Sequence, residues 1–150
     1  MMILYFAYGS NMLSSRIKKR VASVKAIGRA ALYDWCVAFT KKSKDGSGKA
    51  NLCQKAGFIT WGCLYEIDVK EIGKLDKLEK GYARIAVEVE KYDGEIIEAE
   101  TYVSDILIET PVALDVYKKM LVSGAIEHNL PKEYIQYLQQ LPSRPEKAGK

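Results

Sequence analysis

The chain alternates between apolar runs rich in β-branched and aromatic residues and segments whose apolar positions recur every three or four residues. Runs of the first kind predict strands, and the second spacing predicts helices. We expect strands over residues 2–8, 58–67, 82–91 and 96–105, and either two strands or one bent strand over 21–40. We expect helices over residues 12–20, 68–80, 111–127 and 130–141. This order predicts an α+β fold whose sheet curls into a small barrel.

Polar and glycine-containing segments separate these elements. Residues 41–49 predict a flexible loop, and Asp93-Gly94 predicts a tight hairpin turn. Gly62 lies inside a predicted strand, which indicates a bulge or a close approach of another backbone. Residues 142–150 predict a flexible tail. With 150 residues in total, we expect one domain over residues 1–141.

Glu79 is the first candidate for chemistry. In the helix predicted over 68–80, one face is apolar and the opposite face carries lysines. The residues of the apolar face are Ile72, Leu75 and Leu78. Glu79 falls near this face and in the last turn, where the helix dipole disfavours a carboxylate. Burial and the dipole both raise a carboxyl pKa toward that of a working general base. The alternative is a carboxylate at the rim of the core, paired with a lysine or with Arg84.

The turn Tyr8-Gly9-Ser10-Asn11-Met12 is the second candidate, since it ends a strand and precedes a helix. Ser10 or Asn11 is expected to cap that helix. Glycine allows a close backbone approach, and free N–H groups at a helix start favour an anion. Such a turn can hold a carboxylate or form an oxyanion hole. The alternative is an ordinary capped helix start.

Other residue types offer less. Tyr102 can present a hydroxyl to a site or pack in its strand. The three cysteines contain no CxxC pair and are expected to be buried structural thiols; they are Cys36, Cys53 and Cys63. The single histidine, His128, is expected on the surface after a helix. One histidine excludes a histidine-cluster metal site, so no metal is expected, and the odd cysteine count favours a reducing cytoplasm.

Positive charge is concentrated in the first 50 residues. Those residues include ten lysines and arginines but only two acidic residues, a net charge of +8, whereas the whole chain has a formal net charge of +4. This concentration of positive charge has three possible meanings: a site for an anionic ligand, a surface that binds nucleic acid, or a lysine-rich face exposed to solvent. The basic residues of 12–20 have no interleaved aromatic residues, so no nucleic-acid partner is expected. No apolar run approaches the roughly 18 residues of a membrane helix, so no membrane partner is expected either.

Several segments together resemble the γ-glutamylcyclotransferase-like proteins. LYFAYGSNM at 4–12 is similar to the opening signature of that family. Further similar segments follow in order: GRAALYD at 28–34, WGCLYEI at 61–67 and LDKLEKGY at 75–82. Residues 116–141 resemble the C-terminal helices of the γ-glutamylcyclotransferase branch. The resemblance covers residues 2–141 and implies a small, mostly antiparallel β-barrel with flanking helices.

The resemblance also implies roles for particular residues. Glu79 is implied to be the catalytic acid and base, and Tyr102 to help hold the substrate. The loop residues implied to bind a γ-glutamyl group through backbone amides are Tyr8, Gly9, Ser10, Asn11 and Met12. Many members have glycine directly after the glutamate, whereas here Lys80 intervenes before Gly81.

The implied reaction converts a small-molecule γ-glutamyl amino acid into pyroglutamate and a free amino acid, with no cofactor. The substrate's own α-amine attacks its γ-carbonyl, and the glutamate moves the protons. Two alternatives remain open: a γ-glutamylamine cyclotransferase, and a non-catalytic binder of small anions on the same fold. The resemblance is compatible with a monomer or a homodimer.

Overall fold

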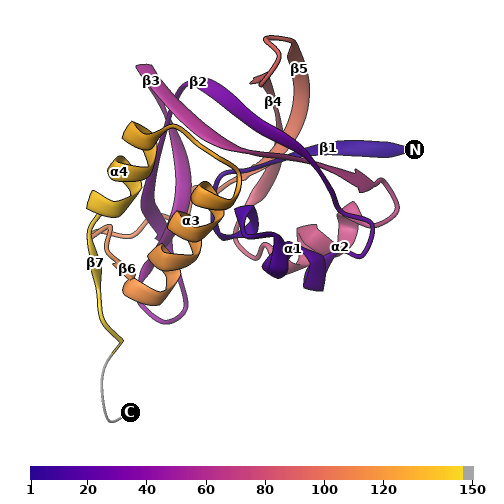
Figure 1. The fold of residues 1–150 in the computed structure, drawn as a ribbon. Coiled ribbons are helices and arrows are strands. Elements are labelled where there is room, and N and C mark those ends of the chain that lie inside the picture. Colours follow the sequence, from indigo (N-terminus) through magenta and orange to yellow (C-terminus); the bar gives the residue numbers. More distant parts are fainter. Residues whose placement is uncertain (147–150) are drawn as a thin grey trace.

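The computed structural model describes residues 1–146, which form a five-stranded barrel with helices packed around it (Figure 1). The barrel strands are β1 (Met2–Ala7), β2 (Lys25–Lys42), β3 (Gly48–Asp68), β4 (Ala83–Lys91) and β5 (Ile96–Val103). The helices are α1 (Ser14–Arg20), α2 (Ile72–Leu78), α3 (Asp115–Glu127) and α4 (Lys132–Gln140), with a short 3-10 turn, η1 (Ser10–Met12). Two short strands, β6 (Ala113–Leu114) and β7 (Ser143–Arg144), form a separate pair.

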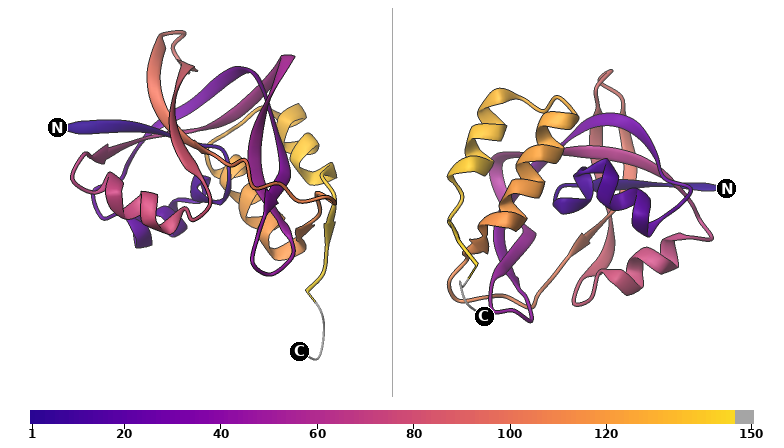
Figure 2. Two further views of the ribbon diagram at one scale, coloured as in Figure 1. Left: turned by 180° about the vertical axis from the view of Figure 1, so that it is seen from behind. Right: turned by 60° about the horizontal axis from the view of Figure 1, so that its bottom comes forward.

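The barrel closes in the strand order β1-β3-β2-β4-β5. Every neighbouring pair is antiparallel except β1 and β5, which meet in parallel where Tyr5 lies opposite Glu100. Two views show α1 and α2 near one another beside the barrel, while α3 and α4 cover another side (Figure 2). The predicted α+β class and the small, mostly antiparallel barrel are confirmed.

The segment predicted as two strands or one bent strand is the single long strand β2. It bends at Gly28 (φ 147°) and Asp34 (φ 67°), and its pairing with β3 shifts register beside both residues. β3 is far longer than the predicted 58–67. Its polar first half pairs with the second half of β2, since backbone hydrogen bonds of a ladder do not require apolar side chains. Only residues 43–47 of the predicted loop lie outside strands.

Helix starts differ most from the prediction. The segment expected to be helical from residue 12 forms η1 first, and α1 begins at Ser14. α2 begins at Ile72 instead of residue 68, because Asp68 accepts a hydrogen bond from the Lys70 amide in a preceding turn (2.9 Å). Residues 113–114 pair as β6, so α3 begins at Asp115 instead of residue 111.

The C-terminal segment is also more ordered than predicted. Within the expected flexible tail, β7 pairs in parallel with β6, so the prediction is wrong for residues 143–144. Residues 142, 145 and 146 lie outside any helix or strand, and residues 147–150 of the predicted tail lie outside the described residues. Among the free cysteines, Cys36 and Cys63 are buried as expected, whereas Cys53 is exposed. No helix within residues 1–146 is both long and apolar enough to cross a bilayer.

Gly62 marks a close backbone approach, one of the two predicted reasons for a glycine in this strand. A Cβ atom at this position would lie 2.3 Å from the carbonyl oxygen of Ala7 and 2.9 Å from the Phe6 ring. The absence of a side chain at Gly62 therefore allows the end of β1, from which the next turn begins, to lie directly against β3.

We expect Gly62→Ala to destabilise the fold by about 2 kcal/mol or more, because a backbone oxygen cannot move aside for a methyl group. Gly73→Ala is the matched control. Nothing lies within 4 Å of a Cβ at Gly73, and alanine is favoured in a helix by about 1 kcal/mol. Urea unfolding of both variants measures the difference. Equal stability of the two variants would contradict the close approach.

Candidate active site

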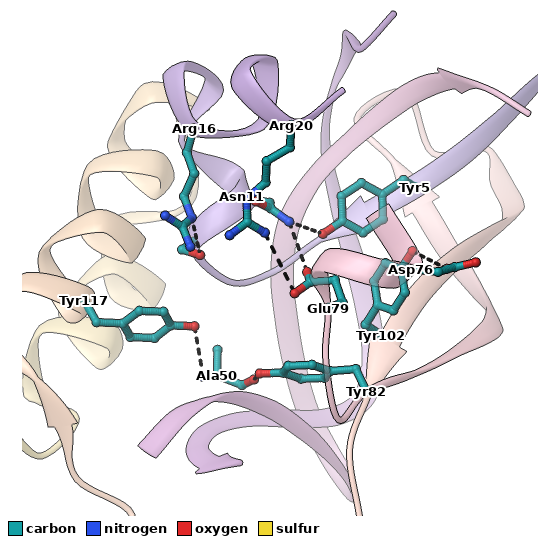
Figure 3. Close-up of polar contacts among 11 residues, drawn as sticks. Tyr5, Asn11, Arg16, Arg20, Ala50, Asp76, Glu79, Tyr82, Tyr102 and Tyr117 are labelled. Carbon is teal, nitrogen blue, oxygen red and sulfur yellow. Dashed lines mark hydrogen bonds and ion pairs between the residues drawn. The ribbon is translucent and has the colours of Figure 1, made fainter. Parts of the chain in front are cut away.

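A small chamber of about 40 Å³ lies where the turn after β1 meets the end of α2 (Figure 3). Its lining comes from β1 and the turn after it, β3, the segment after α2, β5 and α3. The lining residues are Tyr5, Tyr8, Gly9, Ser10, Asn11, Ala50, Glu79, Tyr82, Tyr102 and Tyr117. The structure therefore brings together six of the seven residues predicted for the site. These six come from three segments: 8–11, Glu79 and Tyr102.

Glu79 is the residue that directly follows α2, and its side chain is 19% exposed. Its Oε1 accepts a hydrogen bond from Asn11 Nδ2 at 3.1 Å, and its Oε2 lies 4.0 Å from Arg20 Nη1. The alternative pairing with Arg84 is wrong, because Arg84 binds Asp76 instead (2.9 Å). The carboxylate thus points into the chamber with one amide partner and a distant guanidinium.

Burial dominates the electrostatics of Glu79. Removal from water raises the pKa of this carboxyl, while the positive charges of Arg20, Arg16 and Lys41 pull it back; the net pKa lies above the ordinary 4.5. The helix dipole was one predicted cause, but α2 has only seven residues, and desolvation is the largest cause.

Asn11 connects the turn to Glu79. The side chain is almost fully buried, and its amide nitrogen also donates to the Tyr5 hydroxyl (3.1 Å). The prediction that Ser10 or Asn11 caps a helix is wrong, since Leu13 precedes α1 and no side chain caps it. The buried Oδ1 of Asn11 has no hydrogen-bond partner within residues 1–146. A buried acceptor of this kind is costly unless a ligand donor reaches it.

Met12 is the one predicted site residue that does not line the chamber. Its side chain is fully buried beneath the turn, where a Cβ on Gly124 of α3 would lie 2.7 Å from Met12 Cβ. The Met12 carbonyl accepts hydrogen bonds from Tyr65 (2.9 Å) and from His128 Nε2 (2.7 Å). His128 is therefore not a surface residue as predicted: its side chain is 10% exposed and is hydrogen-bonded to the backbone of the turn.

Tyrosines make up half of the ten residues that line the chamber. The five of them are Tyr5, Tyr8, Tyr82, Tyr102 and Tyr117. Burial raises the pKa of every one, that of Tyr117 to about 12, so all five phenols are neutral near pH 7. The sequence reasoning missed three, Tyr5, Tyr82 and Tyr117. All three lie within segments that carried the resemblance, at 4–12, 75–82 and 116–141, but no local pattern distinguishes these tyrosines from packing residues.

Tyr102 is fixed in place by a charged network outside the chamber. Its hydroxyl donates to Asp76 Oδ1 at 2.6 Å, and Arg84 contacts Asp76 through two nitrogens at 2.9 and 3.3 Å. Arg84 also binds Glu100 (2.8 Å), and the Tyr8 hydroxyl donates to the Tyr102 carbonyl (2.5 Å). Asp76 is thus a positioning residue, three positions before Glu79 on the same segment.

The raised pKa of Glu79 has a consequence for stability. A carboxyl whose pKa is raised by folding holds its proton more tightly in the folded state, so stability falls as the pH rises from about 4.5 through the folded pKa. We therefore expect Glu79→Gln to be more stable than the native chain at pH 7, with the gain shrinking toward pH 4. Urea unfolding across this pH range measures the difference.

Glu71, at the other end of α2, is the matched control. Hydrogen bonds from Ser23 lower the pKa of Glu71, so its contribution has the opposite sign. It is present above pH 4.5 and is lost as the pH falls through the lowered pKa. Glu71→Gln should therefore destabilise the chain at pH 7. A loss of stability in Glu79→Gln at pH 7 would contradict a desolvated carboxylate.

Three comparisons with known proteins agree with this geometry. Residues 60–138 match the model of the AIG2-like family. The chain is 33% identical to the human protein named gamma-glutamylcyclotransferase over 140 residues, which is 87% of this chain and 74% of that one. A solved structure titled gamma-glutamyl cyclotransferase superposes with a TM-score of 0.90 at 30% identity, over 100% of this chain and 93% of that one. The structure of YkqA from Bacillus subtilis gives 0.81 at 26% identity, over 95% and 56%. The chain belongs to the AIG2-like, γ-glutamylcyclotransferase family.

Proposed function

We propose that this protein is a γ-glutamyl cyclotransferase that converts γ-glutamyl amino acids into pyroglutamate and free amino acids. The observation that carries the proposal is the Glu79 carboxylate, held by Asn11 inside a chamber that the turn after β1 also lines. Family membership supports the same reaction class. Glu79 acts as the acid and base, and the turn and Tyr102 hold the γ-glutamyl group.

The α-ammonium group of the substrate binds beside Glu79. It is a cation with three donors, and the chamber offers it the carboxylate and the unpartnered Oδ1 of Asn11. Glu79 removes one proton, which leaves the amine free to attack. The raised pKa of Glu79 suits this step, because a base works best when its pKa approaches the working pH.

Ring closure follows within the substrate. The amine attacks the γ-carbonyl, and a five-membered ring forms as the amide bond to the leaving group breaks. The chamber keeps the glutamyl chain folded, which makes the attack intramolecular and well oriented. The N–H groups at the start of η1 have no acceptor inside that turn, and they stabilise either the oxyanion or the substrate carboxylate. Glu79 then gives the proton to the leaving amine, and no cofactor takes part.

The tyrosines support Glu79 as the base. Since burial keeps the five phenols protonated, they donate hydrogen bonds and do not compete for the ammonium proton. Glu79 is the one carboxylate among the chamber lining.

The reaction can be tested directly with γ-glutamyl-alanine. We expect release of pyroglutamate, and we expect Glu79→Gln to lower kcat by about 10² to 10⁴ because it removes a general acid and base. Chromatographic measurement of pyroglutamate gives the rates, and circular dichroism confirms folding. Glu71→Gln is the control at the other end of α2. Full activity in a folded Glu79→Gln variant would reject the proposed base.

The pH dependence gives a second test. Only the ionised carboxylate accepts a proton, so we expect kcat/KM to rise with pH through the pKa of Glu79, which lies above 4.5. The residual activity of Glu79→Gln should not show this rise.

The alternatives are outcomes of the same experiments. Turnover of γ-glutamylamines without turnover of γ-glutamyl amino acids would assign the amine-specific reaction. Binding without any turnover would assign a non-catalytic binder.

A further inference from the structure

A second, wider cleft opens directly outside the chamber. Its volume is about 680 Å³, and it shares Ser10, Glu79, Tyr82 and Tyr117 with the chamber. A ligand whose glutamyl end occupies the chamber therefore extends into this outer cleft.

The outer cleft is strongly basic. Glu79 is the one carboxylate in its lining, whereas two arginines and five lysines line it. These residues are Arg16, Arg20, Lys41, Lys42, Lys44, Lys49 and Lys80. They come from α1, from the strands and loop of the β2–β3 hairpin and from the segment after α2. Figure 3 shows Arg16 and Arg20 descending from α1 on the side of the chamber next to Glu79.

Most of these cations have no carboxylate partner among the described residues. No ion pair within residues 1–146 involves Arg16, Lys41, Lys42 or Lys44. The two ion pairs that cleft cations do make are long. Lys49 Nζ lies 3.9 Å from Asp45 Oδ2, and Arg20 Nη1 lies 4.0 Å from Glu79 Oε2. Like charges crowded in a concave surface repel one another and attract anions.

Two of the lysines are held at the boundary with the chamber. Lys41 Nζ lies 5.3 Å from the centre of the Tyr82 ring, and Lys49 Nζ lies 4.4 Å from that of Tyr117. Both tyrosines belong to the chamber wall. These cation–π contacts keep positive charge at the passage between chamber and cleft, where the leaving part of a substrate would begin.

We propose that the outer cleft selects an acidic leaving group, so that the preferred substrates are γ-glutamyl peptides whose leaving part carries two or more carboxylates. This inference rests on the proposed function. When the leaving group is a neutral amino acid, its α-carboxylate can contact one or two of the seven cations. A second carboxylate on the leaving group can contact further cations. An uncharged amine as the leaving group uses none.

The chemical step is unchanged for such a substrate. With γ-glutamyl-glutamate, the amide C–N bond breaks as the new ring amide forms, and the α-ammonium proton passes through Glu79 to the leaving amine. The products are pyroglutamate and glutamate, with no oxidant or co-reactant.

The test compares γ-glutamyl-glutamate with γ-glutamyl-glutamine, which has nearly the same shape and one carboxylate fewer. We expect kcat/KM to be roughly five- to tenfold higher for the glutamate peptide at low salt, and the ratio to shrink at 0.5 M NaCl. Lys42→Glu/Lys44→Glu changes two exposed side chains of the cleft and should abolish the preference.

Lys18→Glu/Lys19→Glu is the matched control, since it makes the same charge change on exposed residues of α1 that do not line the cleft. It should keep most of the preference. Equal kcat/KM for the two peptides, or a preference that survives in Lys42→Glu/Lys44→Glu, would overturn the inference.

Calorimetric binding of the two peptides to the native chain separates this inference from the proposed function. If neither peptide is turned over, the proposed function fails. Tighter binding of γ-glutamyl-glutamate, lost in Lys42→Glu/Lys44→Glu, would then still support an acidic-ligand cleft, and equal binding would reject it.

Discussion

The hydrogen bond between the Asn11 amide and the Glu79 carboxylate joins segments that are 68 residues apart in the chain. A carboxylate cannot leave water cheaply, and its placement is tolerated only where partners reach it. Asn11 is the direct partner and Arg20 the distant one. This balance leaves the carboxyl with a raised pKa instead of a neutralising ion pair, which is the property that a proton-transferring group requires.

That hydrogen bond depends on how firmly the turn after β1 is held. Gly62 allows β1 to approach β3, and Gly124 allows α3 to approach Met12. Tyr65 and His128, neither of which lines the chamber, both donate a hydrogen bond to the Met12 carbonyl. The barrel and α3 therefore both hold the turn in place. The Asn11 side chain does not cap a helix, and its amide is free to bind Glu79.

The charges divide the site into two parts. The chamber is lined by neutral phenols around a single carboxylate, which suits the ammonium end of a γ-glutamyl group. The outer cleft carries cations, which suit an acidic remainder. Lys41 and Lys49 lie over Tyr82 and Tyr117 at the boundary, so the same aromatic rings form the wall of one part and support the charge of the other.

The sequence alone was sufficient for the class of fold, the strands with apolar patterns and the unusual position of Glu79. These follow from local periodicity, and the resemblance of LYFAYGSNM at 4–12 and LDKLEKGY at 75–82 indicated the family. Sequence could not predict the polar first half of β3 or the start of α2, because ladder hydrogen bonds and a local turn decided them. It also could not predict the roles of Tyr117 and His128, or the exposure of Cys53.

Charge shows the same division between sequence and structure. Composition showed that the first 50 residues are basic, but a linear count cannot distinguish a solvated face from a binding cleft. Only the barrel's closure brought α1, the β2–β3 hairpin and the end of α2 around one opening. Local sequence determines which elements form, whereas contacts between distant segments determine which side chains share a site, since burial and charge depend on distances in space.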